Sequence, residues 1–447
     1  MKPIQVGLLG IGVVGSGTFN VLKRNQEEIR RRAGRGIDIT MVADLNVARA
    51  QSLVGAGVTV VSDARAVIAN PDIDIVIELI GGYGIAKTLV LEAIAAGKHV
   101  VTANKALLAV HGTEIFAAAS AKGVMVAFEA AVAGGIPIIK ALREGLTANR
   151  IEWVAGIING TTNFILSEMR DKGLDFGVVL KEAQRLGYAE ADPTFDIEGI
   201  DAAHKITLIC AIAFGIPVQF DCAYVEGITR LSAADIKYAG QLGYRIKLLG
   251  MTKRTSKGIE LRVHPCLIPA NRLIANVEGA MNAVLVQADA VGTTLYYGKG
   301  AGSEPTASAV IADLVDIARL HMADAIHRVP HLAFQPNAMS KLVILPMGEV
   351  VTSYYLRLRV ADETGVLAKV TGILAQAGIS IDAVLQREAD EIRQESTTNG
   401  QPQVAQTDVI ILTHDCVEAD MNAAIAQMQG LASVLEPITR IRKEELA

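Results

Sequence analysis

The sequence predicts an α/β protein of three units. These are a doubly wound parallel sheet, an α+β unit with a mixed sheet, and a C-terminal ferredoxin-like unit. Strand-like and helix-like segments alternate with short connections over the first 130 residues, which is typical of right-handed βαβ units. Longer alternating segments follow, and a compact βαββαβ pattern begins near residue 351. We expect boundaries at 1–130, 131–327 and 351–447, with a proline-containing linker over 328–350.

The first unit is predicted from its aliphatic runs and their punctuation by turn residues. Short apolar runs bounded by Gly, Asn and Pro predict buried strands, and longer amphipathic segments predict helices. The expected strands are 4–9, 37–43, 73–80, 99–102 and 124–128, and the expected helices are 14–32, 86–96 and the segment ending at 117.

The second and third units follow from the same patterns. In the second, helices are expected at 137–146, 162–172, 176–186, 199–213 and 306–325, the last packing back on the first unit, with strand-like segments at 153–157, 241–251, 259–263, 273–278, 283–288 and 292–297. In the third, strands are expected at 354–360, 379–386, 408–413 and 434–442, helices at 366–377 and 419–430, and a polar loop at 388–405.

Composition excludes several classes of protein. The net charge of -5 lacks the positive field that nucleic acid or an anionic membrane would require. The longest apolar stretch of interest, between Lys205 and Asp221, is too short to span a bilayer. The four cysteines show no CxxC spacing and no signal peptide is expected, so we predict a cytoplasmic protein with reduced thiols.

Residues 10–15 read G-I-G-V-V-G, directly after the first strand and at the start of a helix. In that setting Gly10 permits a tight turn, Gly12 lets the backbone approach a pyrophosphate, and Gly15 lets helix and strand pack closely. The N–H groups at the start of the helix, around Val13 and Val14, favour a bound anion. The motif therefore predicts a Rossmann domain that binds a dinucleotide.

The identity of the dinucleotide stays open. Asp44 ends the second strand, where a carboxylate accepts hydrogen bonds from a ribose 2′-hydroxyl and favours NAD. Arg49 lies nearby and could instead meet the 2′-phosphate of NADP. Asp44 could also serve simply as the N-cap of the following helix.

The segment 183–205, A-Q-R-L-G-Y-A-E-A-D-P-T-F-D-I-E-G-I-D-A-A-H-K, carries the candidate chemistry. Asp201 and Lys205 are four residues apart and share a helix face, and Glu190 in the preceding loop can reach back to it. Oxidation of an alcohol requires a group that takes the hydroxyl proton, which a lysine beside carboxylates can do. On spacing alone, Asp201 and Lys205 could instead be an exposed i,i+4 ion pair with no catalytic role.

Four separated motifs resemble those of homoserine dehydrogenases. They are A-x3-G-Y-x3-D-P-x2-D-I-x-G-x-D-x3-K (183–205), N-G-T-T-N-F-I-L (159–166), T-A-N-K-A-L-L-A (102–109) and G-K-G-A-G-S-E-P-T (298–306). The resemblance covers residues 1 to about 330. It implies NAD- or NADP-dependent interconversion of L-homoserine and L-aspartate 4-semialdehyde, on the path to threonine and methionine.

The same resemblance implies roles for individual residues. Lys205 would donate or accept the proton, and Asp201 and Glu190 would bind the substrate. Lys105, a second catalytic lysine that also contacts the cofactor, would lie between nicotinamide and substrate. Cofactor contacts are implied at two glycines, Gly187 and Gly302. Without the resemblance, Lys105 is more simply a surface lysine at a helix start, although it follows the carboxyl end of a strand, where ligands collect.

The resemblance also implies a monovalent cation site, for Na+ or K+, in E-A-A-V-A-G-G-I (129–136). Glu129 would supply a carboxylate, and Val132, Gly134 and Ile136 would supply backbone positions, since hard cations prefer oxygen ligands. From the residues alone, Glu129 could equally be an N-cap or a first-turn partner of a Gly-containing loop.

The C-terminal unit opens with A-D-E-T-G-V-L-A (361–368) and resembles an ACT domain, a module that binds amino-acid effectors. This implies feedback inhibition by L-threonine and a homo-oligomer, a dimer or tetramer, with one contact through the mixed sheet. A pure oligomerisation module is the alternative.

Two other functions remain compatible with the residues. One is an oxidoreductase with the same frame and a different small substrate. The other is a sensor that binds dinucleotide and amino acid without turnover, although a sensor needs no proton-transferring lysine. The histidines, His204 included, show no ligand spacing and are better explained by packing.

Overall fold

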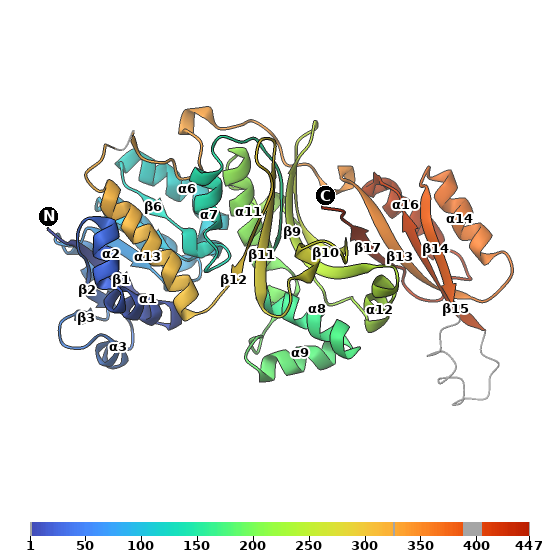
Figure 1. Ribbon diagram of the computed structural model, residues 1–447, viewed down its shortest axis with the longest axis horizontal. Helices are drawn as coiled ribbons and strands as arrows, with labels where there is room; N and C mark the ends of the chain where they lie inside the picture. The colour runs from blue at the N-terminus through green and yellow to red at the C-terminus, as the bar shows by residue number, and fades with distance from the viewer. Residues whose placement is uncertain (1, 325–326, 388–404, 447) are drawn as a thin grey trace.

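The computed structural model describes residues 2–324, 327–387 and 405–446. It is elongated, with the N-terminal unit at one end, the mixed sheet in the middle and the C-terminal unit at the other end (Figure 1). The three units therefore follow one another in space in the order of the sequence, except that helix α13 (Ser303–Leu320) returns to the N-terminal unit.

The N-terminal unit is a six-stranded parallel sheet of order β3-β2-β1-β4-β5-β6. Its strands are β1 (Ile4–Leu9), β2 (Ile37–Ala43), β3 (Thr59–Val61), β4 (Ile75–Glu78), β5 (His99–Thr102) and β6 (Val126–Ala127). This is the strand order of dinucleotide-binding domains. From β1 the chain adds strands toward one edge of the sheet, and from β4 it adds them toward the other. Ligands bind at this switch point, at the carboxyl ends of β1 and β4. The predicted doubly wound parallel sheet is thus confirmed, and β3 is a strand that the sequence patterns did not indicate.

Helices cover both faces of this sheet. They are α1 (Val13–Arg24), α2 (Gln26–Ala33), α3 (Val47–Val54), α4 (Ala64–Ala69), α5 (Gly84–Ala95) and α6 (Lys105–Lys122). The single helix expected over 14–32 is wrong, because Asn25 leaves the helical conformation (φ −106°, ψ 17°) and divides it into α1 and α2. Helix α13 packs on α1, and its Ala307, Val310 and Leu314 are fully buried in the core of this unit.

The middle unit is built on antiparallel strands of order β12-β11-β7-β9-β10. They are β7 (Ile151–Ile157), β9 (Tyr244–Arg254), β10 (Ile259–Pro269), β11 (Met281–Ala288) and β12 (Gly292–Lys299), with a short β8 (Tyr224–Val225) beside β10. The expected strand at 273–278 is wrong: a 3-10 turn, Ile274–Asn276, stands there, because the Asn276 side chain donates to the carbonyl oxygens of Ala270 and Arg272 and curls the chain.

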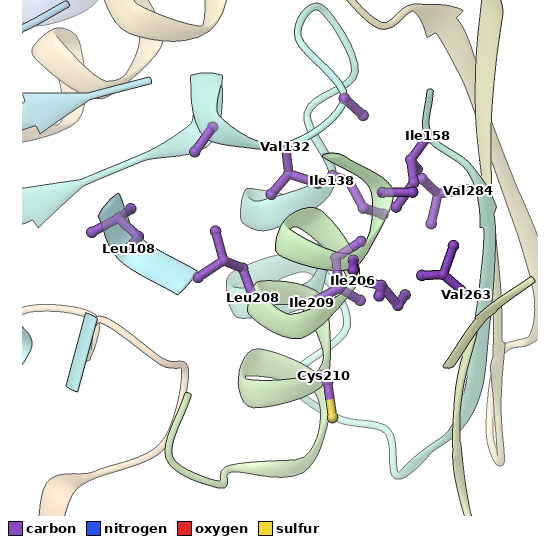
Figure 2. Close-up of a cluster of buried hydrophobic side chains, with 14 of the residues drawn as sticks. Leu108, Val132, Ile138, Ile158, Ile206, Leu208, Ile209, Cys210, Val263 and Val284 are labelled. Atoms are coloured by element: carbon purple, nitrogen blue, oxygen red, sulfur yellow. The ribbon is translucent and has the colours of Figure 1, made fainter. Parts of the chain in front are cut away.

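Helix α11 (Ile200–Phe214) lies at the centre of the molecule, and every residue from Asp201 to Phe214 is buried. Figure 2 shows Ile206 and Ile209 facing Val263 and Val284 of the mixed sheet, while Leu208 lies toward Leu108 of the N-terminal unit. The other helices of this unit are α7 (Ile138–Lys140), α8 (Gly160–Lys172), α9 (Phe176–Arg185), α10 (Thr194–Ile197) and α12 (Ala233–Gln241). The helix expected at 137–146 is only partly α-helical, since a π-turn, Ala141–Gly145, follows α7.

The C-terminal unit has the expected βαββαβ order. Its elements are β13 (Val351–Ala361), α14 (Val366–Gln376), β14 (Ile381–Arg387), β15 (Gln406–Thr413), α16 (Glu418–Gln429) and β17 (Thr439–Lys443), and a short β16 (Cys416–Val417) pairs with β13. The strands are antiparallel in the order β17-β13-β15-β14. The predicted ferredoxin-like fold is therefore confirmed, while the polar loop expected at 388–405 lies, except for Ala405, outside the described residues.

Backbone pairing joins the second and third units into one eleven-stranded sheet. Strand β17 runs parallel to β10, with Cys266 opposite Arg442 and Leu267 opposite Lys443. The segment expected as a linker also contacts β10, since Ile259 and Val343 share a backbone hydrogen bond. The C-terminal unit is therefore continuous with the middle unit, which the sequence did not predict (Figure 1).

Among the described helices, none combines the length and apolarity needed to cross a membrane.

Candidate active site

The glycine loop after β1 has the geometry of a phosphate cradle. Gly10 has φ +88°, and a Cβ there would lie 2.9 Å from the Leu79 carbonyl oxygen. A Cβ on Gly15 would lie 2.3 Å from the Gly10 carbonyl oxygen, so only glycine allows this close packing. A Cβ on Gly12 would meet no atom within 4 Å, so the loop leaves open space in front of Gly12. Val13 is exposed at the start of α1 and Val14 packs against the core.

A cleft of about 450 Å³ opens beside this loop, between β1, β2 and β4. Asp44 lines it, and its carboxylate accepts the N–H groups of Ile11 (3.0 Å) and Asn46 (2.9 Å). The N-cap of α3 is Asn46, which accepts the Arg49 N–H, so Asp44 is not that cap. Arg65 also lines the cleft and is paired with Glu92, whereas Arg49 does not line it.

A second glycine turn lies against the loop. Gly302 has φ +123° and precedes α13, and the Ser303 hydroxyl donates to the Val13 carbonyl oxygen at 2.8 Å. A Cβ on Gly17 would lie 2.3 Å from that same hydroxyl oxygen, which makes the contact between α1 and α13 very close. The turn containing Gly302 is therefore held at the start of α1, close to the cradle.

Two of the residues predicted from 183–205, Asp201 and Lys205, form a cluster with Lys105. The Lys205 Nζ atom donates to Asp201 Oδ2 (2.6 Å) and to the Ile158 carbonyl oxygen (2.7 Å). The Nζ atom of Lys105, the first residue of α6, lies 3.1 Å from Asp201 Oδ1. Because Asp201 and Lys205 are only 4% and 9% exposed, the alternative of an exposed surface pair is wrong.

This cluster lies at the carboxyl edge of the parallel sheet. Lys105 follows β5, whose Thr102 hydroxyl donates to Glu78 Oε2 at the end of β4 at 2.7 Å. The carboxyl ends of parallel strands share one edge of a sheet, and the glycine loop follows β1 at that same edge. The middle unit thus presents its acid and lysine pair to the edge where a dinucleotide binds.

Opposing charges set the protonation of the cluster. Burial alone would raise the pKa of Asp201, but the ammonium groups of Lys205 and Lys105 outweigh it and hold that pKa well below its usual range. Burial lowers the pKa of Lys205; the Asp201 carboxylate opposes this effect and the Lys105 charge adds to it. A lysine with a lowered pKa is a suitable proton acceptor near neutral pH.

Two residues of the site were not recognised from the sequence. The Asn159 Nδ2 group donates both to Asp201 Oδ2 (2.8 Å) and to Asp196 Oδ1 (2.7 Å). Burial raises the pKa of Asp196. Asn159 lies in the motif N-G-T-T-N and Asp196 in the motif D-P-x2-D-I. Their place in these family motifs is the feature of the sequence that could have identified them.

Three further residues considered from the sequence, Glu190, Gly187 and His204, have surroundings that differ from those of Asp201 and Lys205. Glu190 is exposed, and among the described residues no hydrogen bond or ion pair joins its carboxylate to Asp201 or Lys205. Gly187 has φ +78° in the exposed turn that ends α9. His204 is buried among Tyr83, Phe195 and Phe220, and burial lowers its pKa to about 4, in agreement with a packing role.

The segment 129–136 begins with a buried carboxylate, Glu129, which accepts hydrogen bonds from the first turn of α7. Glu129 is 4% exposed, and its two oxygens accept the N–H groups of Ile139 (2.9 Å) and Lys140 (2.7 Å). Its own N–H donates to Asp313. Ala133 and Gly134 both have positive φ, and within the described residues no hydrogen bond reaches the carbonyl oxygens of Val132 and Gly134. The Ile136 carbonyl oxygen accepts the Ile138 N–H at 2.8 Å.

Comparison with known proteins matches three family models in succession. Residues 10–129 match the NAD-binding domain of homoserine dehydrogenase, residues 137–315 match homoserine dehydrogenase, and residues 354–409 match the ACT domain. The chain is 60% identical to a homoserine dehydrogenase of Pseudomonas aeruginosa over 447 residues, all of both chains. It is 58% identical to that of Neisseria gonorrhoeae over 446 residues, with 100% of each chain covered. The crystal structure of a homoserine dehydrogenase from Thiobacillus denitrificans superposes with a TM-score of 0.94 and 64% identity, covering 100% of this chain and 99% of that chain.

Proposed function

We propose that this chain, which belongs to the homoserine dehydrogenase family of NAD(P)-dependent oxidoreductases, performs its chemistry at the Lys105–Asp201–Lys205 cluster. The reaction is the interconversion of L-homoserine and L-aspartate 4-semialdehyde. The observation that carries the proposal is the Lys105–Asp201 ion pair, 3.1 Å long, which joins the acid and lysine pair to the coenzyme-binding edge of the sheet.

The residues of the N-terminal unit fit a nicotinamide dinucleotide. The open space at Gly12 and the N–H groups at the start of α1 suit a pyrophosphate, and Asp44 lies where an adenosine ribose would be held. Gly302 would approach the coenzyme from the second glycine turn, and Gly187 from the turn after α9. A bound nicotinamide coenzyme supplies hydride-transfer chemistry at the carbinol carbon of the substrate.

The proton of the substrate hydroxyl passes to Lys205 Nζ as the alcohol is oxidised, and returns from it in reduction. Asp201 and the Ile158 carbonyl oxygen hold the amine in position. The lowered pKa of Lys205 favours its neutral, accepting form. Asp201 and Glu190 bind the substrate, Glu190 from its exposed turn, and Lys105 acts between the substrate and the nicotinamide.

A monovalent cation, Na+ or K+, is proposed at the turn 129–136. The ligands would be the Glu129 carboxylate and the main-chain carbonyl oxygens of Val132, Gly134 and Ile136. Such hard oxygen ligands are the kind that these cations prefer. The free carbonyl oxygens of Val132 and Gly134 support this fit. A cation there would fix the turn, whose Gly134 lies against the 298–302 segment.

The activity is tested with the purified chain, L-homoserine and either NAD+ or NADP+, by the ultraviolet absorbance of the reduced nicotinamide. Turnover of L-homoserine well above that of L-serine, L-threonine and simple alcohols supports the proposal. Turnover of another alcohol in preference, or coenzyme binding without any turnover, contradicts it.

L-Threonine is the proposed effector of the ACT unit. Support comes from the match of residues 354–409 to the ACT family and from the continuous sheet that ties this unit to the middle one. L-Threonine should inhibit at saturation and protect the backbone amides of 361–368 from hydrogen exchange, while D-threonine should do neither. Removing the unit is a poor test, because truncation at Pro346 would expose the edge of β10 and its buried Arg262.

A homo-oligomer, a dimer or a tetramer, is proposed as the assembled form. Strand β12 ends the sheet in the middle unit and carries the exposed Tyr297. An uncovered edge strand with an aromatic side chain is a surface that a second copy can cover. Light scattering coupled to gel filtration tests this assembly, and a monomer at micromolar concentration would contradict it.

A further inference from the structure

A buried charge network crosses from the ACT unit to the middle unit. Arg442 of β17 is fully buried and donates to Glu418 at 2.9 Å and 2.6 Å through Nε and Nη2. Its remaining nitrogen, Nη1, donates to Glu226 Oε2 at 2.9 Å. Glu226 belongs to the middle unit, directly after β8, and the Tyr224 hydroxyl also donates to Glu226 Oε2 at 2.8 Å. One guanidinium thus links carboxylates of two units.

The main chain around Glu226 leads directly to the start of α11. The Glu226 N–H donates to the Val263 carbonyl oxygen, and the Ile228 N–H donates to the Ile197 carbonyl oxygen, both at 2.8 Å. Between them, Gly227 packs so closely that a Cβ there would lie 2.3 Å from the Ile197 carbonyl oxygen. Any displacement of Glu226 along this segment must therefore move the corner at Ile197.

That corner holds the acid and lysine pair. Ile197 follows Asp196, whose Oδ1 accepts from the same Asn159 amide that donates to Asp201. Gly199, with φ +83°, is the N-cap of α11 and lies two residues before Asp201. A continuous series of contacts therefore runs from Arg442 through Glu226 and the 196–199 corner to Asp201 and Lys205.

We propose that Glu226 is a positioning residue: its ion pair with Arg442 lets the ACT unit hold the 196–199 corner, and through it the geometry of Asp201 and Lys205. The proposal rests on the function assigned above to that pair. It follows that a change in β17 or α16 alters turnover by shifting this corner, without any contact between the ACT unit and the substrate. Coupling between distant sites requires such a contiguous set of packed and hydrogen-bonded groups, or an equivalent shared equilibrium.

A second ion pair crosses the same boundary and serves as the control. Arg262 Nη1 donates to Glu444 Oε1 at 2.7 Å, joining β10 to the residue after β17. The Glu444 carboxylate also accepts from Thr352. Within the described residues the Glu444 carboxylate itself makes no hydrogen bond to the 224–228 segment, and its partner Arg262 pairs with Tyr224 through the main chains of β10 and β8. Loss of either carboxylate weakens the boundary, but only loss of Glu226 disturbs the corner.

The test compares Glu226→Ala, Glu226→Gln and Glu444→Gln in the full-length protein, by kcat, coenzyme Kd and Tm. We expect Glu226→Ala to lower kcat about tenfold with an unchanged coenzyme Kd. Glu226→Gln should lie in between, because its amide oxygen still accepts from Arg442. Glu444→Gln should lower Tm about as much as Glu226→Gln does. It should keep kcat within about twofold of the parent protein.

Unchanged kcat in Glu226→Ala, or losses of kcat that follow Tm equally in all three variants, would overturn the proposal. Inactivity of the unsubstituted protein toward L-homoserine would instead refute the proposed function. In that case the coupling is still decided by hydrogen exchange: faster exchange over 197–205 in Glu226→Ala than in Glu444→Gln supports it, and equal exchange overturns it.

Discussion

Lys105 of the N-terminal unit and Asp201 of the middle unit form an ion pair in which Lys105 Nζ lies 3.1 Å from Asp201 Oδ1. The other oxygen of the same carboxylate accepts from Lys205 at 2.6 Å. One buried carboxylate therefore bridges two lysines from two units, and the distance between the units fixes the geometry of the cluster.

Replacing Lys205 by methionine should abolish most of the activity. Methionine has a similar volume and no amine, so the hydroxyl proton loses its acceptor while the fold is retained. We expect kcat for L-homoserine oxidation to fall by about 10²–10⁴-fold, the range for loss of a general acid or base. Coenzyme Kd, measured by fluorescence of the reduced nicotinamide, should not change. Lys181→Met, at an exposed position on α9, is the control, and normal turnover in Lys205→Met would refute the assigned role.

The charge of Lys105 should shift the pH dependence. Its positive charge contributes to lowering the pKa of Lys205, so its removal raises that pKa. In Lys105→Met the neutral form of Lys205 appears only at higher pH. The rising limb of kcat for alcohol oxidation should therefore move to higher pH, as measured across the neutral and alkaline range. Lys87→Met, which removes a lysine paired with Glu114, should leave the limb in place; an unshifted or downward-shifted limb in Lys105→Met contradicts the electrostatic model.

Local features of the site could be predicted from the sequence, because short-range spacing determines them. The glycine loop is a turn of six residues, and Asp201 and Lys205 share a face through the helical repeat alone. The bridge from Asn159 to Asp196 and Asp201 could not be predicted, since it joins residues 37 and 42 positions apart. The parallel pairing of β10 with β17 joins residues still further apart. Neither strand carries a local signal for its partner, because each mixes charged and apolar residues in a pattern that could pair with several strands.

Two glycines of the cradle should respond differently to alanine. Gly12→Ala places a methyl group in open space at a backbone conformation that alanine tolerates (φ −65°). Its Tm should be unchanged while its coenzyme Kd rises about tenfold, since the methyl group displaces the pyrophosphate. Gly15→Ala forces a methyl group to 2.3 Å from the Gly10 carbonyl oxygen and should cost about 1–3 kcal/mol of stability. Equal Tm values for the two variants would contradict this difference.

The charge of Asp44 should control the preference between NAD and NADP. A carboxylate in the cleft beside the glycine loop repels the 2′-phosphate of NADP. Asp44→Asn keeps the shape and one acceptor oxygen for the Ile11 N–H but removes the charge. The ratio of kcat/KM for NADP+ to that for NAD+ should rise about tenfold. Asp63→Asn, in the same cleft as the N-cap of α4, is the matched control, and an unchanged ratio in Asp44→Asn would show that Asp44 does not face the 2′ position.

A monovalent cation should stabilise the folded protein through the turn 129–136. A ligand that binds only the folded state raises the free energy of unfolding by about 2–3 kcal/mol at a concentration one hundredfold above its Kd. Tm should therefore be higher in NaCl or KCl than in tetramethylammonium chloride of equal ionic strength, because the larger ion cannot enter a turn built for small hard cations. Glu129→Gln should remove this difference, whereas Glu144→Gln, at a half-buried carboxylate nearby, should retain it. The same Tm in all three salts would exclude a cation at this turn, and the free carbonyl oxygens of Val132 and Gly134 would then be explained by water alone.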